Sequence, residues 1–455
     1  MTEFIPPYPK RHQKLLNPLS LLRLARNDLL SVWSEDAFNF QFMGRKVFNQ
    51  HVFIANHPDI VKYVFVDQNS NYERKSPMMR KALEALLGDG LFISDGETWA
   101  NRRKIQTPLF TTQHVIRYSE IMVQVSNEMC ATWEPQDGKN IHVLPEMAKL
   151  TAEIICRCLF GNQLGIEKAT EVVSAFTAYQ AAIEQMDLAT FLGLPSWFPL
   201  PGINPKKAEE AARRIHAVVD DIINNSMEHD VEGSLLGLFL EAAKDDKYDP
   251  LTKIQIRNEL IVLFMAGHET TANTLAWAWY LISQVPDVEQ RIHAEIDSVV
   301  GDQRLPCYDD YSKLVFTRAV LDETMRLYPP VPVLSRQSHR EDVIRKRAIP
   351  PDSIMLVIPW LLHRHKQYWD KPDHFIPERF LPNAPRKINK YAYIPFSIGP
   401  RVCLGKYFGQ IELVLSLTAL MQRFRLCLPQ GTAVTHECRL TLRPKGGLPM
   451  RLEKR

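Results

Sequence analysis

Apolar residues recur at helical spacing over most of the chain from about residue 113 to residue 328. The pattern is clearest in two segments, Pro205–His229 and Leu251–Val285, and each predicts one helix. A further helix is predicted from Pro286 to Gly301, because proline is tolerated in the first turn of a helix and glycine is common just past its end. We therefore expect a mainly α-helical protein.

Strand patterns are few, and they come from both ends of the sequence. Gly44–Asn56 alternates like a pair of strands. Ala348–His363 predicts a hairpin that turns at Pro350–Asp352. The tail Glu437–Arg455 predicts two short strands that turn at Lys445–Gly447. We expect the two ends to share a small sheet, so that residues 1–455 form one interleaved α+β domain, mainly α with small β-sheets.

The composition is that of an ordinary globular protein. The 455 residues are 45% hydrophobic and 24% charged, and the formal net charge of +3 argues against general nucleic-acid binding. The seven cysteines are dispersed without a paired CxxC motif. Neither a secreted disulfide framework nor a zinc site is therefore predicted.

No segment predicts a transmembrane anchor. The longest obvious apolar run, Leu260–Ala266, is far shorter than the roughly 18 residues that a membrane span needs. We therefore expect a soluble, cytoplasmic protein. Asn17–Trp33 has apolar residues at helical spacing, which fits either packing on the protein's own core or peripheral contact with a membrane surface.

The stretch PFSIGPRVCLG, Pro395–Gly405, places one cysteine just before a predicted helix. Glycines at 399 and 405 suggest tight turns, and the helix start favours a thiolate at Cys403. A lone thiolate suits an axial ligand of haem iron, which needs only one protein atom. Arg401 could bind a haem carboxylate, and Phe396 could shield the sulfur. A buried structural thiol is the plainer alternative.

A second polar group interrupts the longest apolar helix, at AGHETT, Ala266–Thr271. Gly267 costs about 1 kcal/mol relative to alanine inside a helix, so it needs a reason. Thr270 can donate a hydrogen bond to a preceding carbonyl, and Glu269 beside it makes an acid–hydroxyl pair that could relay protons. The alternative is a kinked helix with a solvated Glu269.

These residues resemble one family. Phe396, Gly399, Arg401, Cys403 and Gly405 match the haem-binding loop of the cytochromes P-450, the haem-thiolate monooxygenases. The resemblance implies haem b (iron protoporphyrin IX) with Cys403 as the axial iron ligand.

The distal residues take their roles from the same resemblance. The segment that includes Ala266 crosses the distal haem face, and Gly267 leaves room for O2. Thr270 hydrogen-bonds the bound dioxygen, and Glu269 helps to deliver protons.

Three further stretches resemble the family. Glu323 and Arg326 in LDETMRLYPP, closed by Arg379 of FIPERF, resemble a buried ion-pair network with a structural role, although by spacing alone they are an ordinary surface pair.

Two other groups resemble contacts to haem propionates. They are Trp99 and Arg103 in DGETWANRRK, and Arg336 in PPVPVLSRQ. The alternative for Arg103 and its neighbours Arg102 and Lys104 is a solvated basic face, which in the family lies near the docking surface of an acidic electron-transfer partner.

The implied architecture is a single-domain cytochrome P-450 fold with haem between the long central helix and the cysteine-loop helix. We expect a β-rich lobe from about residues 40–70, 331–365 and 437–455, and a helical lobe from about 95–328 and 404–424. No room remains after the cysteine loop for a fused reductase. Electrons should therefore come from NAD(P)H indirectly, through a ferredoxin, a flavodoxin-type protein or another flavoprotein, to a monomeric enzyme.

The implied reaction inserts one atom of O2 into a hydrophobic small molecule such as a fatty acid, terpenoid or polyketide. The pocket is expected between residues 76–92, 186–198, 263–270 and 331–334. Its expected lining residues are Met78, Met79, Leu87, Phe92, Phe264, Val331 and Val333.

The nearby cations Arg74, Lys75 and Arg80 either hold a substrate carboxylate or are solvated. A peroxide-driven hydroxylase or isomerase and a haem gas sensor are the alternatives, but such hydroxylases and isomerases usually lack the acid–threonine pair found here.

Overall fold

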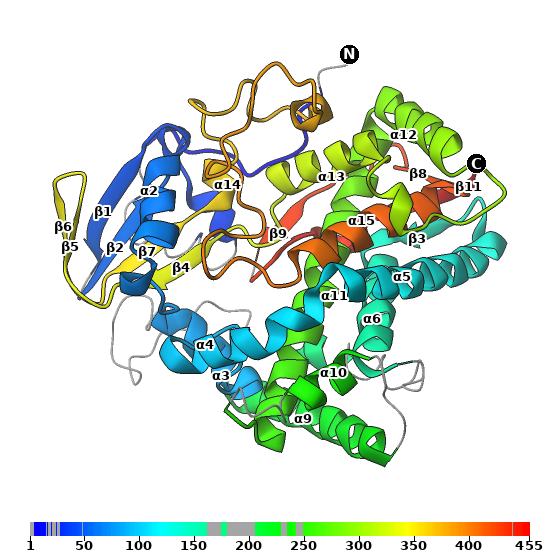
Figure 1. Cartoon of the computed structure of the whole chain (residues 1–455). Helices are drawn as coiled ribbons and strands as arrows, with labels where there is room; N and C mark the ends of the chain where they lie inside the picture. Colours follow the sequence, from blue (N-terminus) through cyan, green and yellow to red (C-terminus); the bar gives the residue numbers. More distant parts are fainter. Residues whose placement is uncertain are drawn as a thin grey trace.

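The computed structural model describes residues 4–14, 16, 20, 24, 28–47, 49–161, 174–179, 205–228, 234–242, 249–438 and 440–455. The described part is mainly helical, with small sheets (Figure 1). The helices are α2 (Pro58–Lys62), α3 (Pro77–Leu87), α4 (Gly96–Gln106), α5 (Thr112–Trp133), α6 (Val143–Phe160), α9 (Pro205–Glu228), α10 (Leu235–Ala242), α11 (Lys253–Gln284), α12 (Pro286–Val299), α13 (Val315–Leu327), α14 (Pro359–Leu362) and α15 (Lys406–Met421).

The strands are short and fall into four small sheets. They are β1 (Phe42–Val47), β2 (Gln50–Ala55), β3 (Asn140–His142), β4 (Leu334–Gln337), β5 (Asp342–Ile344), β6 (Arg347–Ile349), β7 (Ile354–Val357), β8 (Phe424–Cys427), β9 (His436–Cys438), β10 (Leu442–Pro444) and β11 (Pro449–Lys454). The predictions of a mainly helical chain and of helices at α9, α11 and α12 are confirmed.

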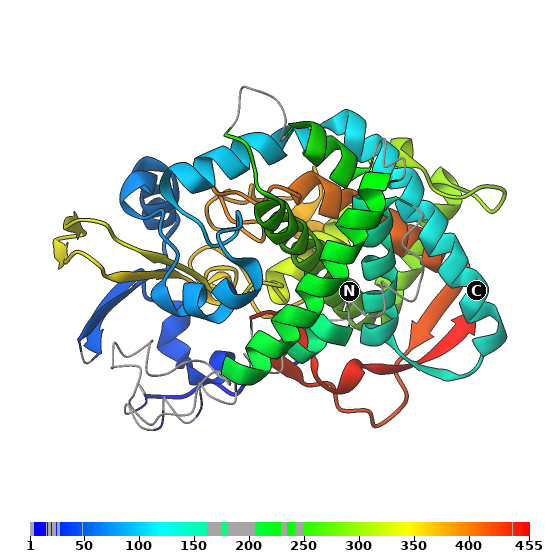
Figure 2. The ribbon, with the colours of Figure 1, turned by 90° about the horizontal axis from the view of Figure 1, so that it is seen from below.

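Helix α11 is the central element of the fold. It begins with a capping box between Thr252 and Gln255, and buried residues occupy all of its faces over much of its length. A helix that is apolar all round belongs in a core. Accordingly α11 packs against α6, α13 and α15, while α9 covers its amino-terminal part and lies nearest the viewer when the molecule is seen from below (Figure 2).

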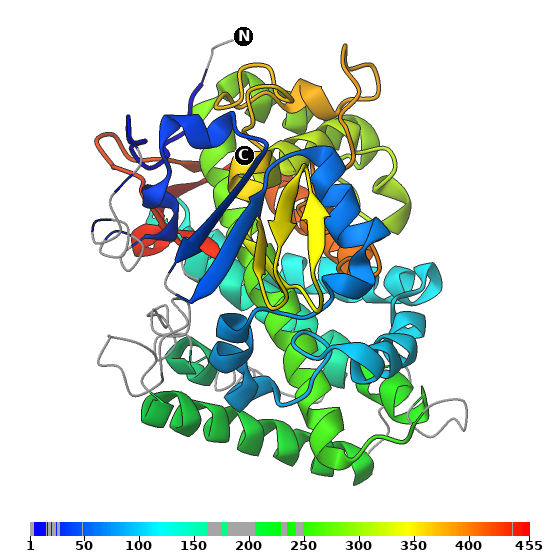
Figure 3. The ribbon, with the colours of Figure 1, turned by 90° about the vertical axis from the view of Figure 1, so that its left-hand side faces the viewer.

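The largest sheet joins two distant parts of the chain. Its order is β1-β2-β7-β4, with β2 parallel to β7 and the other pairs antiparallel. Figure 3 shows these blue and yellow strands side by side. The predicted pair at Gly44–Asn56 is confirmed as β1 and β2.

Two strand predictions were wrong. The Ala348–His363 stretch is no hairpin, because β6 pairs with β5 while β7 joins the β1-β2-β7-β4 sheet, and residues 359–362 form helix α14. The carboxyl-terminal tail has three strands instead of two, and they do not share a sheet with β1 and β2. Strand β10 pairs with β9, and β11 lies between β3 and β8.

Within the described residues, no helix is both long enough and apolar enough to span a bilayer. The predicted helix at Asn17–Trp33 lies largely outside them, and its last turns form a short 3-10 helix at Leu29–Val32.

Candidate functional site

The cysteine loop ends at the amino terminus of α15, as the sequence predicted. The Cys403 N–H donates to the Phe396 carbonyl (2.9 Å), and the Val402 N–H donates to the Gly399 carbonyl (3.0 Å). Gly399 has a φ of 79°, and a Cβ there would stand 2.0 Å from the Phe65 carbonyl oxygen, so only glycine fits. Gly405 caps α15 with an ordinary φ of −83°, so its backbone alone does not require glycine.

The Cys403 thiol is accessible yet surrounded by protein. Its side chain is exposed, but burial among the neighbouring residues raises the pKa of the thiol. The Gly405 N–H, Arg103 and Lys406 act in the opposite direction. Exposure of the side chain and a pKa raised by burial are compatible, because a small group can contact the sulfur while the surrounding residues keep most water away from it. Such a sulfur suits a ligand that binds within the protein.

Three cations, of which one is buried and two are partly exposed, gather near this loop. Arg336 is 3% exposed, and burial lowers its pKa to about 9. Burial also lowers the pKa of Arg401 to about 10 and that of Lys75 well below its usual range. Repulsion between the cations contributes to these shifts: Arg336 and Arg401 lower the pKa of Lys75, and Arg401 lowers the pKa of Arg336. Among the described residues, no carboxylate lies within ion-pair distance of these three cations.

Among the contacts that the structure describes for the three cations, none is an ion pair, and Glu73 and Asp95 act on Arg401 only from longer range. Arg336 donates to the Ser335 carbonyl (3.0 Å), and Arg401 donates to the Ser94 carbonyl (2.8 Å) and stacks 4.5 Å from the Trp99 ring centre. The Nε of Arg401 is buried without a partner. Buried cations are expensive unless an anion pairs with them. An anionic group between them, such as the two carboxylates of haem, fits this arrangement.

Trp99 and Arg103 lie on α4 beside the same loop. Arg103 donates from Nη1 to the Val402 carbonyl (2.9 Å), one residue before Cys403. Burial lowers the pKa of Arg103, while Cys403 raises it. The indole of Trp99 faces Arg401. Both residues are thus brought to the cysteine loop.

The neighbouring Arg102 differs from the solvated basic face that its sequence suggested. It is 4% exposed and pairs with Asp89 (2.8 Å) and with Glu259 of α11 (3.1 Å). Sequence reasoning missed Glu259, since a single glutamate in an apolar helix does not reveal its partners.

An accessible strip interrupts the buried surface of α11. Phe264 and Thr271 are 4% and 5% exposed, whereas Ala266 is exposed and Glu269 and Thr270 are partly exposed. The accessible side of a core helix faces a space that a small molecule or cofactor can enter. The AGHETT motif is therefore the part of α11 that such a group could reach.

Gly267 has a packing role in the described structure. A Cβ at this position would lie 3.0 Å from two side-chain carbons of Ile155 on α6. The glycine therefore lets α6 approach α11 closely. This physical reason differs from the room for O2 that the family resemblance implies.

The acid–hydroxyl pair makes short hydrogen bonds. Thr270 donates to the Ala266 carbonyl (2.8 Å), as its helical position predicted. Glu269 accepts a hydrogen bond from Thr441 (2.6 Å), next to strand β10. The two side chains thus connect the accessible strip of α11 with the carboxyl-terminal strands.

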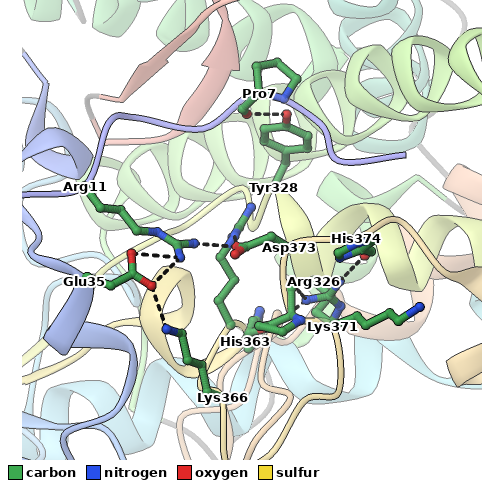
Figure 4. A network of polar contacts seen from close by, with 12 residues as sticks. Pro7, Arg11, Glu35, Arg326, Tyr328, His363, Lys366, Lys371, Asp373 and His374 are labelled. Carbon is green, nitrogen blue, oxygen red and sulfur yellow. Dashed lines mark hydrogen bonds and ion pairs between the residues drawn. The ribbon is translucent and has the colours of Figure 1, made fainter. Parts of the chain in front are cut away.

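The predicted Glu323–Arg326–Arg379 group is buried, so the surface-pair alternative is wrong. Glu323 and Arg326 are each 0% exposed and form a two-pronged pair (2.6 and 2.8 Å), and Arg379 lies 3.4 Å from Glu323. Arg326 also donates to the carbonyls of His363 and His374, both at 2.9 Å (Figure 4).

This group is linked to the cysteine loop through His363. The Ile394 N–H donates to His363 Nε2 (2.9 Å), and Ile394 lies two residues before Phe396. The three charged residues are therefore connected by hydrogen bonds to the segment that leads into the cysteine loop.

The network also reaches the amino-terminal segment. Arg11 pairs with Asp373 and with Glu35, and Glu35 pairs with Lys366 (2.6 Å), as Figure 4 shows. Tyr328 donates to the Pro7 carbonyl (2.7 Å). Pro7 and Arg11 of the amino-terminal segment therefore contact the end of α13 and the loop around Asp373, to which Arg326 of α13 also binds.

The expected pocket residues divide into two groups. Leu87 (0%) and Phe264 (4%) are buried in the core, and Phe264 stacks on His268. The partly buried ones are Met78, Met79, Phe92, Val331 and Val333. Residues 186–198 lie outside the described residues.

The cations near the pocket do not behave alike. Arg74 and Arg80 lie 4.0 and 2.7 Å from Asp95, as surface pairs do. Lys75 instead turns toward Phe92, with its Nζ 4.5 Å from the ring centre. The sequence did not reveal that Lys75 lies near Arg336 and Arg401, because a run of basic residues does not indicate which side chain turns toward the interior.

A set of residues around the loop fits haem: one accessible thiol, and a group of buried and partly buried cations that no carboxylate among the described residues pairs with. Among the described residues, no cluster of histidine, cysteine and carboxylate side chains could hold a bare metal ion.

Comparison with known proteins gives one consistent family. The cytochrome P450 family matches residues 6–449. Cyclooctatin synthase from Streptomyces melanosporofaciens is 30% identical over 86% of this chain and 84% of its own. Cyclooctat-9-en-7-ol 5-monooxygenase from the same organism is 30% identical over 84% and 82%. The crystal structure of the cytochrome P450DA haem domain superposes with a TM-score of 0.82 at 24% identity, covering 99% of this chain and 98% of that one.

Proposed function

This chain belongs to the cytochrome P450 family and is a P450 monooxygenase, and from that premise we propose that it inserts one atom of O2 into a hydrophobic organic substrate. The reaction would be a hydroxylation or an epoxidation, with electrons delivered by a separate ferredoxin, flavodoxin-type protein or flavoprotein. We place this reaction in the cytoplasm.

The observation that carries the proposal is the Cys403 thiol beside three cations that form no ion pair among the described residues. Cys403 would hold the haem iron, and Arg336, Arg401 and Lys75 would hold the carboxylates, with Trp99 and Arg103 beside them. When bound, haem supplies the redox chemistry that activates O2. The chain's own contribution is then to position the substrate and to control protons.

Proton control is proposed for Thr270 and Glu269. The Thr270 hydroxyl lies on the accessible strip of α11 and can pass on a proton while it accepts another. The Glu269 carboxylate, hydrogen-bonded to Thr441, can take up a proton from the side of the carboxyl-terminal strands. This adjacent pair favours O2-dependent oxidation over the peroxide-driven and gas-sensing alternatives.

The substrate is proposed to be largely hydrocarbon. The partly buried side chains expected at the pocket are apolar, namely Met78, Met79, Phe92, Val331 and Val333. Two relatives carry names that refer to cyclooctatin and to cyclooctat-9-en-7-ol, and the second name, that of an unsaturated alcohol, supports a substrate that is largely hydrocarbon.

The decisive test is the absorption spectrum of the reduced protein with carbon monoxide. The wild type should show a Soret band far to the red of ordinary haem–CO, because a thiolate donates electron density to iron. Cys403→Ser should lose this band. Cys158→Ser, a change at a buried thiol on α6, should keep it. A red-shifted band in Cys403→Ser would refute the role of Cys403.

A further inference from the structure

We propose that Glu259 is a positioning residue that fixes the segment Gly88–Ser94, and so sets the place of the Phe92 ring at the substrate side of the site. The proposal rests on the proposed function, because Phe92 matters only if a substrate binds beside it. It concerns a buried carboxylate that none of the family motifs includes.

Glu259 is buried, and it lies on the same face of α11 as Ala266 and Thr270 of the accessible strip. It precedes Ala266 by seven residues and Thr270 by eleven, so all three share one face of the helix. At 1.5 Å per residue, Glu259 stands about 10 Å along the axis from Ala266. The carboxylate is 0% exposed, and buried charges persist only where partners hold them.

The partners of Glu259 come from the segment after α3 and from α4. The Leu91 N–H donates to both carboxylate oxygens (3.1 and 3.0 Å), and Gln106 donates from Nε2 (2.7 Å). Arg102 makes an ion pair with it (3.1 Å) and a second pair with Asp89 (2.8 Å). Every partner is a donor, and the partners use both oxygens of the Glu259 carboxyl group, whereas an amide would offer only one accepting oxygen.

The glycines of the segment allow this close contact. A Cβ at Gly88, which has a φ of 52°, would meet Asn258 Nδ2 at 2.2 Å. A Cβ at Gly90 would meet Val262 at 2.9 Å. The segment therefore lies against α11 on both sides of Glu259, and the carboxylate holds the backbone at the closest point.

Fixing the Leu91 amide fixes the next residue, Phe92. The Phe92 ring lies beneath Lys75, 4.5 Å from its Nζ. At the far end of the segment, the Ser94 carbonyl accepts from Arg401 (2.8 Å). The segment is thus tied to α11 at one end and to the cysteine loop at the other, with Phe92 between them.

The test uses the haem-loaded protein and two azoles that bind iron, imidazole and 4-phenylimidazole. The two probes share the iron-binding imidazole, and only 4-phenylimidazole carries the additional ring that would contact Phe92 if the proposal holds. Glu259→Gln should change the ratio of their Kd values by about tenfold, because the segment loses its fixed position. A change in the ratio of less than about threefold would overturn the proposal, as would an equal loss of affinity for both probes.

Two controls separate positioning from general loss of stability. Asp310→Asn removes another buried carboxylate that pairs with an arginine and accepts from a backbone N–H, here Arg304 and Cys307, and it should leave the ratio unchanged. In a Phe92→Ala background, Glu259→Gln should add less than about twofold, since its effect passes through Phe92. Additive effects of the two changes would contradict the proposal.

Hydrogen exchange keeps the inference testable without haem chemistry. If the wild type bound neither azole at iron, the proposed function would fail, but the tie to the segment would still be measurable. The Leu91 amide should exchange at least about tenfold faster in Glu259→Gln than in the wild type, while amides of α15 stay unchanged. Equal exchange rates at Leu91 would overturn the positioning role.

Discussion

At the scale of single residues, two threonines on α11 make the same bond in different surroundings. Thr270 donates to the Ala266 carbonyl and Thr274 donates to the Thr270 carbonyl, each at 2.8 Å. Thr274 is 1% exposed, whereas Thr270 lies on the accessible strip. Of the two hydroxyls, only that of Thr270 is accessible to a group beside α11, so the pair offers a matched comparison for the proton role proposed for Thr270.

Thr270→Ala should leave haem binding intact and divert electrons from product to hydrogen peroxide, raising the peroxide yield per electron several-fold. The reason is the loss of the hydroxyl that supplies a proton at the site. The measurement compares peroxide formed with NAD(P)H consumed, using a surrogate ferredoxin and its reductase. Thr274→Ala is the matched control and should keep the wild-type yield. A wild-type peroxide yield in Thr270→Ala would count against the relay.

Some site residues could be predicted from their neighbours in the sequence, and others depend on contacts between distant segments. The Cys403 loop was predictable because its glycines, its cysteine and the following helix are adjacent in sequence. Lys75 and Glu259 could not be predicted, since their partners come from other elements: Arg336 and Arg401 repel Lys75, and Leu91 donates to Glu259. Charge and burial at such positions become visible only when the elements are packed together.

At the scale of elements, the helices were predictable and some strands were not. The limits of α11 follow from local features, a capping box at Thr252 and an apolar pattern that ends near Val285. The turn at Pro350–Asp352 was also a real reversal, but its polar groups bond to Ser338, not across a hairpin. Strand β7 instead pairs with β2, about 300 residues earlier, and turn chemistry carries no information about so distant a partner.

The buried Glu323–Arg326 pair links α13 to the segments before the cysteine loop. Glu323→Gln should destabilise the protein by about 3–5 kcal/mol, because it leaves a buried arginine without its counter-charge. Haem should also dissociate faster, since glutamine keeps only one accepting oxygen for the donors Arg326 and Ile376, and the loop loses support. Urea unfolding and transfer of haem to apomyoglobin measure the two effects.

Glu153→Gln serves as the comparison for this prediction. Glu153 pairs with Arg157 at 2.7 Å along α6, but both side chains are partly exposed, so this change should cost less than about 1 kcal/mol. If both variants lost the same stability, the buried network would have no special structural role.

At the scale of the whole molecule, the fold brings together segments from the two ends of the chain around one site. Arg11 reaches Asp373, and the Cys403 loop connects through His363 to Arg326 on α13. The interior that results contains ionisable groups whose pKa values shift in opposite directions. Burial lowers the pKa of His268 to about 4, and burial raises the pKa of Glu259 to about 7.

These two shifts have opposite effects on the pH dependence of folding. The folded protein binds fewer protons than the unfolded chain at His268, so the stability from this residue is full above pH 6.5 and is lost as pH falls toward 4. At Glu259 the folded protein binds more protons, so that stability is present below pH 4.5 and is lost as pH rises through 7. Between these limits the two contributions partly cancel.

His268→Phe should therefore expose the remaining dependence. Phenylalanine keeps the aromatic contact with Phe264, where the rings now stack 5.6 Å apart, but it cannot take up a proton when the chain unfolds. As the pH falls from 6.5 to 4, the unfolding free energy of the variant should rise relative to that of the wild type, by up to about 1.4 kcal/mol for each pH unit. Urea unfolding at several pH values in this range measures the difference. A constant difference between variant and wild type would show that His268 is protonated alike in the folded and unfolded states, and that the packing around α11 does not exclude its charge.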